Sequence, residues 1–322
     1  MKTAKIGLAL VTGGAGFIGS HLSEGLLRLG YGVRVLDNLS SGSLGNLEGA
    51  MGKGLEFVQG DILDRALVGE ACQGATHVFH LAAMASVPQS LADPLNCLSV
   101  NGEGTLNVFE GAAAASARRL VFASTSAVYG DLPGPHGEWL ATRADTPYAA
   151  CKLLGENFAA YYREHRGLPT VSLRYFNVYG PRQSFDGPDS GVIPKFIGMI
   201  LAGEAPLIHG DGDQTRDFIH VLDVVAATIV AGTREGASGV YNVATGTPVR
   251  INDLSKLLMG LCPGSKEPAY LPPRPGDPLQ SWGSVERAAA DLGFKPRIPL
   301  AEGLKGLLEG KAPLGGEAIP LH

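Results

Sequence analysis

The chain has 322 residues, of which 45% are hydrophobic and 18% charged. This composition provides enough apolar surface for the core of one large α/β domain or two smaller ones, and it excludes disordered and low-complexity proteins. The net charge of −5 lacks the basic excess that a nucleic-acid-binding surface needs. No apolar run approaches the roughly 20 residues of a membrane span, so we expect neither a nucleic-acid nor a membrane partner.

The four cysteines form no C-x-x-C pair and no His–Cys cluster at zinc spacing, so no metal site is expected. Scattered cysteines of this kind favour a reducing, cytoplasmic location. The apolar run near the N-terminus is too short for a signal peptide and leads directly into a glycine-rich turn without a cleavage-like site.

Short apolar runs alternate with helix-like spacing through the first half of the chain. Strands are predicted at residues 6–11, 33–36, 55–58, 77–82, 120–123 and 170–175, and helices at 17–29, 94–117 and 148–165. This alternation predicts a parallel sheet with helices on both faces, which is a doubly wound (Rossmann) α/β fold.

After residue 176 the pattern changes. Loops rich in Pro and Gly are predicted at 180–191, 203–213 and 263–278, with a helix at 221–232 and a strand at 240–243. We interpret this half as a smaller lobe interleaved with the end of the first domain. The predicted bounds are 1–176 and 218–246 for the larger domain, 177–217 and 247–311 for the lobe, and 312–322 for a tail.

A glycine-rich turn follows the first predicted strand. Its glycines fit both G-x-G-x-x-G and G-x-x-G-x-x-G, and residues without Cβ let backbone amides and a helix N-terminus approach a pyrophosphate. Asp37 ends the second predicted strand, 18 residues after Gly19. A carboxylate there accepts hydrogen bonds from the adenosine ribose and repels a 2′-phosphate, which predicts NAD as the cofactor. The alternative is a structural turn with a surface Asp.

Tyr148 and Lys152 lie four residues apart on a predicted helix and so share a face. Lowering a phenol pKa from about 10 to about 7 needs roughly 4 kcal/mol, and one cation about 5 Å away gives about 3 kcal/mol at an effective dielectric near 20. Lys152 together with an oxidised nicotinamide ring is therefore predicted to make Tyr148 a base. Taken alone, this spacing more often means a core Tyr and an exposed Lys.

Three hydroxyl residues, Ser124, Thr125 and Ser126, directly follow the fifth predicted strand. The carboxyl ends of strands in such sheets face the ligand crevice, where a hydroxyl can pass a proton to the tyrosine. The alternative is a helix cap or turn. We expect Ser124 or Ser126 to substitute partly for Thr125.

Together, these motifs resemble the extended short-chain dehydrogenase/reductase family, and within it the nucleotide-sugar epimerases and dehydratases, most closely the UDP-hexose 4-epimerases. The resemblance covers residues 5–308. It rests on residues 12–20, 37–38, 60–61, 80–83, 101, 124–130, 148 with 152, 174–181, 214–220 and 274–277.

The resemblance implies roles for individual residues. Catalysis is assigned to Tyr148, Lys152 and Thr125. NAD contacts are assigned to Gly13, Gly16, Phe17, Ile18, Gly19, Asp37, Asn38, Ser41, Gly42, Asp61, Ile62, Leu81, Ala82, Ala83, Asn101, Tyr148, Lys152 and Tyr175. Sugar-nucleotide contacts are assigned to Ser86, Thr125, Ser126, Asn177, Val192, Arg216, Arg274, Asp277 and Ser281.

One of these assignments has a physical basis of its own. Two guanidiniums, Arg216 and Arg274, can clamp a diphosphate through paired hydrogen bonds; the alternative for Arg216 is a surface salt bridge with Asp213 or Asp217. The resemblance also implies that Ser281 stands where related epimerases restrict the pocket with a large Tyr; the alternative is that Ser281 only begins the next turn and helix. We therefore expect room for an N-acetylated sugar.

The resemblance also reduces the number of reactions that the enzyme is expected to catalyse. The 4,6-dehydratases need an acidic pair after the catalytic Thr, where this chain has Ser126 and Ala127. We therefore expect 4-epimerisation of a UDP-hexose through a transient 4-keto sugar with tightly bound NAD, in a homodimer packed through residues 94–117 and 148–165. The alternatives are a UDP-glucuronate 4-epimerase, in which Lys195 or Arg182 serves the carboxylate, a decarboxylase, or an NAD(H)-sensing or scaffold protein.

Overall fold

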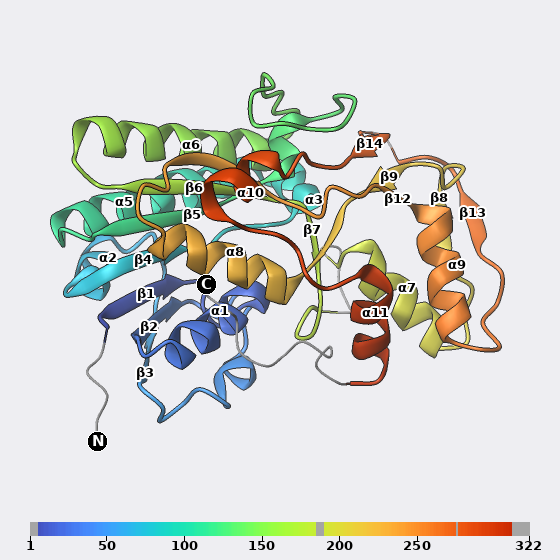
Figure 1. The fold of residues 1–322 in the computed structure, drawn as a ribbon, viewed down its shortest axis with the longest axis horizontal. Helices are drawn as coiled ribbons and strands as arrows, with labels where there is room; N and C mark the ends of the chain where they lie inside the picture. The colour runs from blue at the N-terminus through green and yellow to red at the C-terminus, as the bar shows by residue number, and fades with distance from the viewer. Residues whose placement is uncertain (1–5, 185–189, 275, 311–322) are drawn as a thin grey trace.

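The computed structural model describes residues 6–184, 190–274 and 276–310. Its central feature is a seven-stranded sheet in the order β3-β2-β1-β4-β5-β6-β11, in which every neighbouring pair is parallel (Figure 1). The strands are β1 (Leu8–Thr12), β2 (Gly32–Asp37), β3 (Leu55–Gln59), β4 (Ala75–His80), β5 (Arg119–Thr125), β6 (Thr170–Tyr175) and β11 (Gly239–Val243). The order reverses between β1 and β4, so the predicted doubly wound fold is confirmed.

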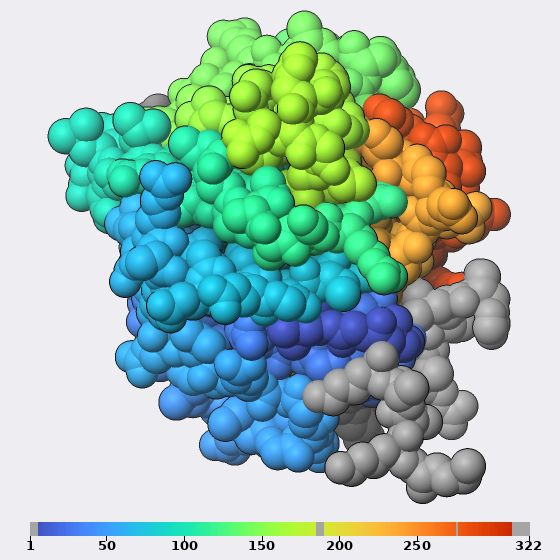
Figure 2. Space-filling model, turned by 90° about the vertical axis from the view of Figure 1, so that its left-hand side faces the viewer, coloured from blue at the N-terminus to red at the C-terminus, as the bar shows by residue number. Residues whose placement is uncertain are grey.

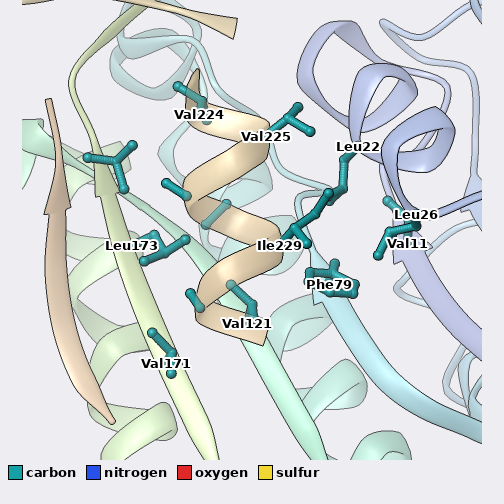
Figure 3. Packing of buried hydrophobic residues seen from close by; sticks show 14 of the residues in the cluster. Val11, Leu22, Leu26, Phe79, Val121, Val171, Leu173, Val224, Val225 and Ile229 are labelled. Carbon is teal, nitrogen blue, oxygen red and sulfur yellow. The ribbon is translucent and has the colours of Figure 1, made fainter. Parts of the chain in front are cut away.

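Apolar side chains of the strands point alternately to two separate cores, because successive residues of a strand face opposite sides. In β5, Val121 packs under α8 (Val221–Thr233), which lies beside α1 (Phe17–Arg28) on this face of the sheet, as Figure 3 shows. Its neighbour Phe122 packs under α2 (Arg65–Cys72), α5 (Thr105–Ala114) and α6 (Pro147–His165). Because both faces of the sheet are buried, the sequences of these strands are continuous apolar runs rather than alternating apolar and polar residues.

The predicted long helix at 94–117 is divided. It consists of α4 (Pro94–Leu98), a π-helical segment η2 (Ser99–Gly104) and α5, and α3 (Val87–Ala92) precedes it. Such π segments insert an extra residue into a helix and often occur at functional sites. The sequence does not reveal this interruption, because the apolar residues before and after the π-helical segment keep the spacing of a single helix face.

The second lobe has its own core between α7 (Val192–Leu201), α9 (Ile251–Leu261) and α11 (Leu300–Leu308), at the right of Figure 1. The predicted loops at 203–213 and 263–278 each contain a strand, because β8 (Leu207–His209) pairs with β13 (Ala269–Leu271). Further short strands are β7 (Asn177–Tyr179) with β10 (Phe218–His220), and β12 (Val249–Arg250) with β9 (Thr215–Arg216) and β14 (Gln280–Ser281). The remaining helical segments are η1 (Leu44–Leu47), η3 (Ser126–Tyr129) and α10 (Glu286–Leu292).

The first half of the chain forms most of the face seen in Figure 2, where orange and red segments of the second lobe appear only at the right-hand edge. Within the described ranges, no helix combines the length and hydrophobicity needed to cross a bilayer. The same ranges contain no group of three or more His, Cys, Asp or Glu side chains that could hold a metal ion.

Candidate active site

A cleft of about 340 Å³ opens between the carboxyl ends of β5 and β6 and the second lobe. The first turn of α1, the first turn of α6 and the start of α7 also contribute to its wall. Seven of the predicted site residues line it together: Phe17, Ile18, Thr125, Tyr148, Tyr175, Asn177 and Val192. The structure thus brings together residues assigned to cofactor, catalysis and sugar from positions more than 100 apart in the sequence.

The glycine-rich turn is shaped for a close approach to α1. Gly13 has φ +70°, and a Cβ there would lie 2.7 Å from the backbone nitrogen of Ala82. A Cβ at Gly19 would collide with the carbonyl oxygen of Gly13. The helix begins after Gly16 without a side-chain cap, so its first-turn amides are available for a phosphate group. These features fit the pyrophosphate of NAD.

The end of β2 is tied to the glycine turn. The carboxylate of Asp37 is buried and accepts hydrogen bonds from the amides of Ala15 (2.9 Å) and Leu39 (2.8 Å). A Cβ at Gly42 would lie 2.9 Å from the carbonyl carbon of Ala15, so the loop after β2 passes close to the glycine turn. Ser41 is the residue before Gly42 in this loop. The sequence did not indicate that Asp37 also holds the turn.

The resemblance implies that Asp61 and Ile62 contact the adenine of NAD; both follow β3, and Asn38 follows the neighbouring strand β2. The amide of Asn38 donates to the Asp61 carboxylate over 2.8 Å. Ile62 is buried, and a Cβ at Gly104 would lie 2.7 Å from its side chain. The π-helical segment thus packs against Ile62, beneath the predicted adenine position.

Leu81, Ala82 and Ala83 form the loop after β4, and Asn101 holds its end. The Asn101 side chain donates to the carbonyl of Met84 (2.9 Å) and accepts from the Met84 amide (2.8 Å). Both polar ends of this amide are therefore used within the protein, which makes Asn101 a positioning residue for the loop.

The predicted catalytic pair lies in the first turns of α6, where Thr146 caps the helix by accepting from the amide of Ala149. The Lys152 ammonium lies 5.9 Å from the centre of the Tyr148 ring and donates to the carbonyl of Ala123 over 2.8 Å. The Thr125 hydroxyl forms a hydrogen bond with the Tyr148 phenol. Tyr148 and Lys152 thus lie on one face of α6 with Thr125 beside the phenol, and the contact of Lys152 with Ala123 is an addition to the predicted arrangement.

The prediction makes Tyr148 a base only with both Lys152 and an oxidised nicotinamide ring beside it. Burial raises the pKa of Tyr148 to about 12, against which the hydrogen bond from Thr125 acts in the lowering direction. Burial also lowers the pKa of Lys152 to about 8. The prediction counted the attraction of the phenolate to Lys152 and to an oxidised nicotinamide ring, but it omitted the desolvation of the two side chains. The polypeptide alone therefore keeps Tyr148 neutral, and a further positive charge beside the phenol is needed to ionise it.

Ser124 cannot substitute for Thr125. Its hydroxyl donates to Glu156 over 2.5 Å, and Glu156 is held by Arg174 through two hydrogen bonds of 2.9 and 2.7 Å. All three side chains are buried. The expectation that Ser124 shares the catalytic role is therefore wrong, because its donor is already used in an ion-paired cluster.

Two other predicted serines lie outside the lining of the cleft. Ser86 is buried and caps α3 by accepting from the amide of Gln89 over 3.1 Å. Ser126 begins η3, a short helix that Thr125 caps through the amide of Ala127. The cap interpretation of the hydroxyl cluster therefore holds for Thr125 as well, alongside its contact with Tyr148.

The residues assigned to the nucleotide gather on the second lobe. Arg216 forms an ion pair with Asp277 (Nη2 to Oδ1, 2.5 Å), and Arg274 contacts the ring of His209 over 2.9 Å. Ser281 is buried beside Arg216 in the parallel pairing of β14 with β9.

The alternative partners of Arg216 are engaged elsewhere. Asp217 is buried and accepts from Thr245 and Gly246, while Asp213 pairs with Arg250. The alternative of a salt bridge to Asp213 or Asp217 is thus wrong: Arg216 pairs with Asp277.

One polar residue of the cleft was not predicted. Gln183 donates its amide to the carbonyl of Val178 over 3.3 Å, which leaves its carbonyl oxygen buried and without a partner among the described residues. An uncharged polar side chain within a Pro- and Gly-rich loop was the available signal.

Arg182, considered as a partner for a substrate carboxylate, instead binds Glu24 on α1 over 2.6 Å. Neither Arg182 nor Lys195 is among the described residues that line the cleft.

Comparison with known proteins agrees with this geometry. The model of the NAD dependent epimerase/dehydratase family matches residues 9–244. The chain is 40% identical over 304 residues to the UDP-glucose 4-epimerase of Mycolicibacterium smegmatis, covering 93% of this chain and 97% of that protein. It is 38% identical to a solved UDP-N-acetylglucosamine 4-epimerase from Methanobrevibacter ruminantium M1 in complex with UDP-N-acetylmuramic acid, with TM-score 0.91 over 95% of this chain and 98% of that one.

A solved UDP-glucose 4-epimerase from Thermus thermophilus in complex with NAD is 37% identical, with TM-score 0.86 over 94% of this chain and 98% of that one. Relatives named as decarboxylases and a dehydratase are also similar.

A doubly wound sheet with a tyrosine–lysine pair beside a glycine-rich helix start defines a nicotinamide-dependent enzyme. The chain belongs to the NAD dependent epimerase/dehydratase family, and its cofactor is NAD.

Proposed function

We propose that this enzyme is a 4-epimerase of neutral UDP-hexoses, acting on UDP-glucose and UDP-galactose and on their N-acetylated counterparts. The observation that carries the proposal is the composition of the cleft. None of its described lining residues bears a charged side chain, whereas Tyr148, Thr125, Asn177 and Gln183 supply hydroxyl and amide groups.

This composition argues against the other reactions of the family. A dehydratase needs an acid near the catalytic Thr, and the next residues here are Ser126 and Ala127. A glucuronate would bring a carboxylate into a cleft that offers no cationic partner among its described residues, and an unpaired buried charge is costly. The side chain considered for that role, Arg182, is engaged by Glu24 instead.

In the proposed mechanism, the Tyr148 phenolate accepts the proton of the sugar 4-hydroxyl while Thr125 holds that oxygen by a hydrogen bond. Bound NAD supplies the acceptor, and later the donor, for the hydrogen at sugar C4. The resulting 4-keto sugar turns over within the cleft, and Tyr148 returns the proton. Lys152 stabilises the phenolate by its charge.

The nucleotide must stay fixed while the sugar turns. Arg216, Arg274 and Asp277 belong to the second lobe, and Phe218, two residues after Arg216, lines the cleft. We assign the diphosphate to the two arginines and the ribose to Asp277, which implies that binding exchanges part of the Arg216–Asp277 ion pair for contacts with the nucleotide.

A panel assay tests the function. Purified protein is mixed with UDP-glucose, UDP-galactose, UDP-N-acetylglucosamine, UDP-N-acetylgalactosamine and UDP-glucuronate, and the products are separated. We expect interconversion within each neutral pair and no turnover of the glucuronate. Turnover of UDP-glucuronate at a comparable kcat/KM, or a decarboxylated or dehydrated product, would contradict the proposal.

Sugar size is the subject of a separate prediction. Ser281 is small and lies in register with Arg216, so Ser281→Tyr should depress activity on the N-acetylated pair by the roughly 1–3 kcal/mol of an overpacked site while sparing the plain hexoses. Ser281→Ala is the matched control and should leave both pairs unchanged. Equal loss on both substrate classes would remove Ser281 from the sugar pocket.

We also propose a homodimer through α5 and α6, in the cytoplasm. A largely apolar hollow of about 480 Å³ lies on these helices, lined by Leu106, Leu154, Phe158, Tyr161 and others. Tyr161 is 48% exposed there, as expected of a side chain that a second copy covers. Light scattering coupled to size exclusion should give twice the mass of the chain, and Tyr161→Glu should halve it. The proposed cytoplasmic location rests on a separate observation. The four cysteines are all free, as is usual for proteins of a reducing compartment.

A further inference from the structure

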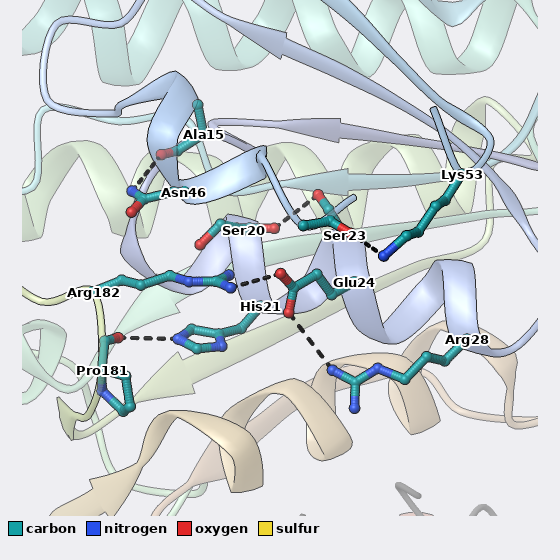
Figure 4. Close-up of polar contacts among 12 residues, drawn as sticks. Ala15, Ser20, His21, Ser23, Glu24, Arg28, Asn46, Lys53, Pro181 and Arg182 are labelled. Atoms are coloured by element: carbon teal, nitrogen blue, oxygen red, sulfur yellow. Dashed lines mark hydrogen bonds and ion pairs between the residues drawn. The ribbon is translucent and has the colours of Figure 1, made fainter. Parts of the chain in front are cut away.

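Helix α1 contacts the loop that enters the cleft, as well as the cofactor turn. From its second turn, Glu24 binds Arg182 (Oε1 to Nη2, 2.6 Å) and His21 contacts the carbonyl of Pro181 (Nε2 to O, 3.0 Å), as Figure 4 shows. The other carboxylate oxygen of Glu24 faces Arg28 at 3.6 Å. These contacts join residues about 160 apart in the sequence.

Both contacts persist at neutral pH. The carbonyl of Pro181 can only accept, so Nε2 of His21 carries the hydrogen. Burial lowers the pKa of His21, which keeps the ring neutral. The side chains of Glu24 and Arg182 are only 20% and 26% exposed, so water screens this ion pair less than a pair on the open surface.

The loop is held in an unusual conformation at the contact. Arg182 has φ +68°, a left-handed backbone that residues with a side chain rarely adopt. The next residue, Gln183, turns into the cleft, where its amide donates to Val178 and its carbonyl oxygen is buried without a partner in the described chain. Strained backbone persists where surrounding contacts hold it, and here those contacts come from α1.

We propose that Glu24 and His21 are positioning residues that hold Gln183 in place to bind the sugar, so that one helix organises the cofactor site with its first turn and sugar recognition with its second. The proposal rests on the proposed function in one respect, that the ligand of the cleft is a UDP-hexose. Because the free oxygen of Gln183 is an acceptor, its partner on the sugar is a hydroxyl or an acetamido N–H.

The test compares Glu24→Ala with Arg28→Ala. Both remove one partner of the Glu24–Arg28 contact, but only Glu24→Ala releases Arg182. Calorimetry measures the affinity for UDP-N-acetylglucosamine and for UDP, and NAD released by denaturation reports whether α1 is intact. We expect Glu24→Ala to weaken UDP-sugar binding about 3- to 10-fold, the range of one neutral hydrogen bond, with UDP affinity and NAD content unchanged. Arg28→Ala should change none of these.

A double-mutant cycle shows whether Glu24 acts through Gln183. Gln183→Ala should weaken UDP-sugar binding to a similar degree, and adding Glu24→Ala should then have no further effect. The exchanged pair Glu24→Arg with Arg182→Glu should restore affinity, which separates positioning from general damage to the helix.

Additive losses in the cycle, an equal loss of UDP affinity, or unchanged binding by Glu24→Ala would overturn the proposal. Because the measurement is binding, a wild-type protein that binds the UDP-sugar without epimerising it would defeat the proposed function and leave this test intact. A wild-type protein that binds UDP but no UDP-hexose would defeat both.

Discussion

Burial shifts the pKa values of Tyr148 and Lys152, the two proposed catalytic side chains, in opposite directions. It raises the pKa of Tyr148 to about 12 and lowers that of Lys152 to about 8, because a low-dielectric environment disfavours the charged form of each. Ionising the phenol therefore depends on positive charge that arrives with the cofactor. The enzyme without NAD is thus a poor base at neutral pH.

Removal of the phenol oxygen isolates this chemistry. Tyr148→Phe should lower kcat by at least the 10²- to 10⁴-fold of general-base catalysis, because the ring still packs and only the ionisable group is lost. Circular dichroism and NAD content should match the wild type. More than about a tenth of the original activity would show that another group is the base.

Thr125 should also be sensitive, although less so than Tyr148, because Ser124 is not available to replace it. Thr125→Val removes the hydrogen bond to Tyr148, and a bond to a charged group contributes about 1.5–3 kcal/mol, so kcat should fall about 10- to 100-fold. Ser124→Ala is the matched control: it should reduce stability and largely preserve kcat, since its hydroxyl serves Glu156. The reverse ranking would reassign the two hydroxyls.

At the scale of elements, α6 carries Tyr148 and Lys152 and is also hydrogen-bonded to the ends of two strands of the sheet. One turn beyond Lys152, Glu156 reaches the end of β5 through Ser124 and the end of β6 through Arg174. The guanidinium of Arg174 in turn lies 4.7 Å from the centre of the Tyr129 ring. This cluster holds the ends of two strands, which carry Thr125 and Tyr175, against the catalytic helix.

Breaking this cluster should be costly to stability. Glu156→Ala leaves the buried Arg174 without its partner, so the free energy of unfolding should fall by about 3–5 kcal/mol in urea denaturation. Glu164→Ala, which breaks an exposed pair with Arg163 on the same helix, should cost less than about 0.5 kcal/mol. A small loss for Glu156→Ala would mean that the pair is not tightly packed.

Local motifs explain what sequence alone could predict of these elements. The strands of the sheet are buried on both faces, so their apolar runs are visible without knowledge of their neighbours, and the glycine turn, Asp37 and the Tyr148–Lys152 pair each lie within one supersecondary unit. The π-helical segment, the strands β8 and β13, and the Glu24–Arg182 contact depend on partners distant in the sequence. Spacing carries no signal for them, and this is why Gln183 and the role of Ser124 were missed.

At the scale of the whole molecule, buried histidines link stability to pH. Burial lowers the pKa of five of the eight histidines, namely His21, His77, His80, His136 and His220. The values are about 3 for His80 and about 4 for His220. His80 is neutral between the hydroxyls of Thr12 and Thr105, where it joins β1 to α5.

The lowered pKa values of the buried histidines determine the direction in which stability changes with pH. Unfolded histidines bind protons below about pH 6.5, whereas the folded ones do not, so the unfolded state gains stability as pH falls. His80 and His220 alone should make the free energy of unfolding fall by up to about 2.7 kcal/mol per pH unit near pH 5. Urea denaturation between pH 6.5 and 5 measures this slope. The raised pKa values of Asp217 and Asp223 act in the opposite direction wherever these carboxyl groups titrate.

His220→Asn is the matched variant for this measurement. His220 caps α8 by accepting from the amide of Leu222, and Asn preserves such a cap without taking up a proton. Near pH 5 the free energy of unfolding of this variant should change with pH less steeply than that of the wild type, by roughly 1.4 kcal/mol per pH unit, because unfolding takes up one proton fewer. An unchanged slope would show that His220 is already protonated in the folded protein.

The last strand of the sheet reaches its place late in synthesis. β11 begins at Gly239, 64 positions after β6 ends at Tyr175, and α8, which covers this face of β6, begins only at Val221. A ribosome adding about 5–20 residues per second leaves the nascent chain for roughly 3–13 s with the edge of β6 unpaired. Until α8 has been made, which takes up most of that interval, Val171 and Leu173 lack the helix that buries them in the finished protein, so this stretch is where a nascent-chain chaperone should bind.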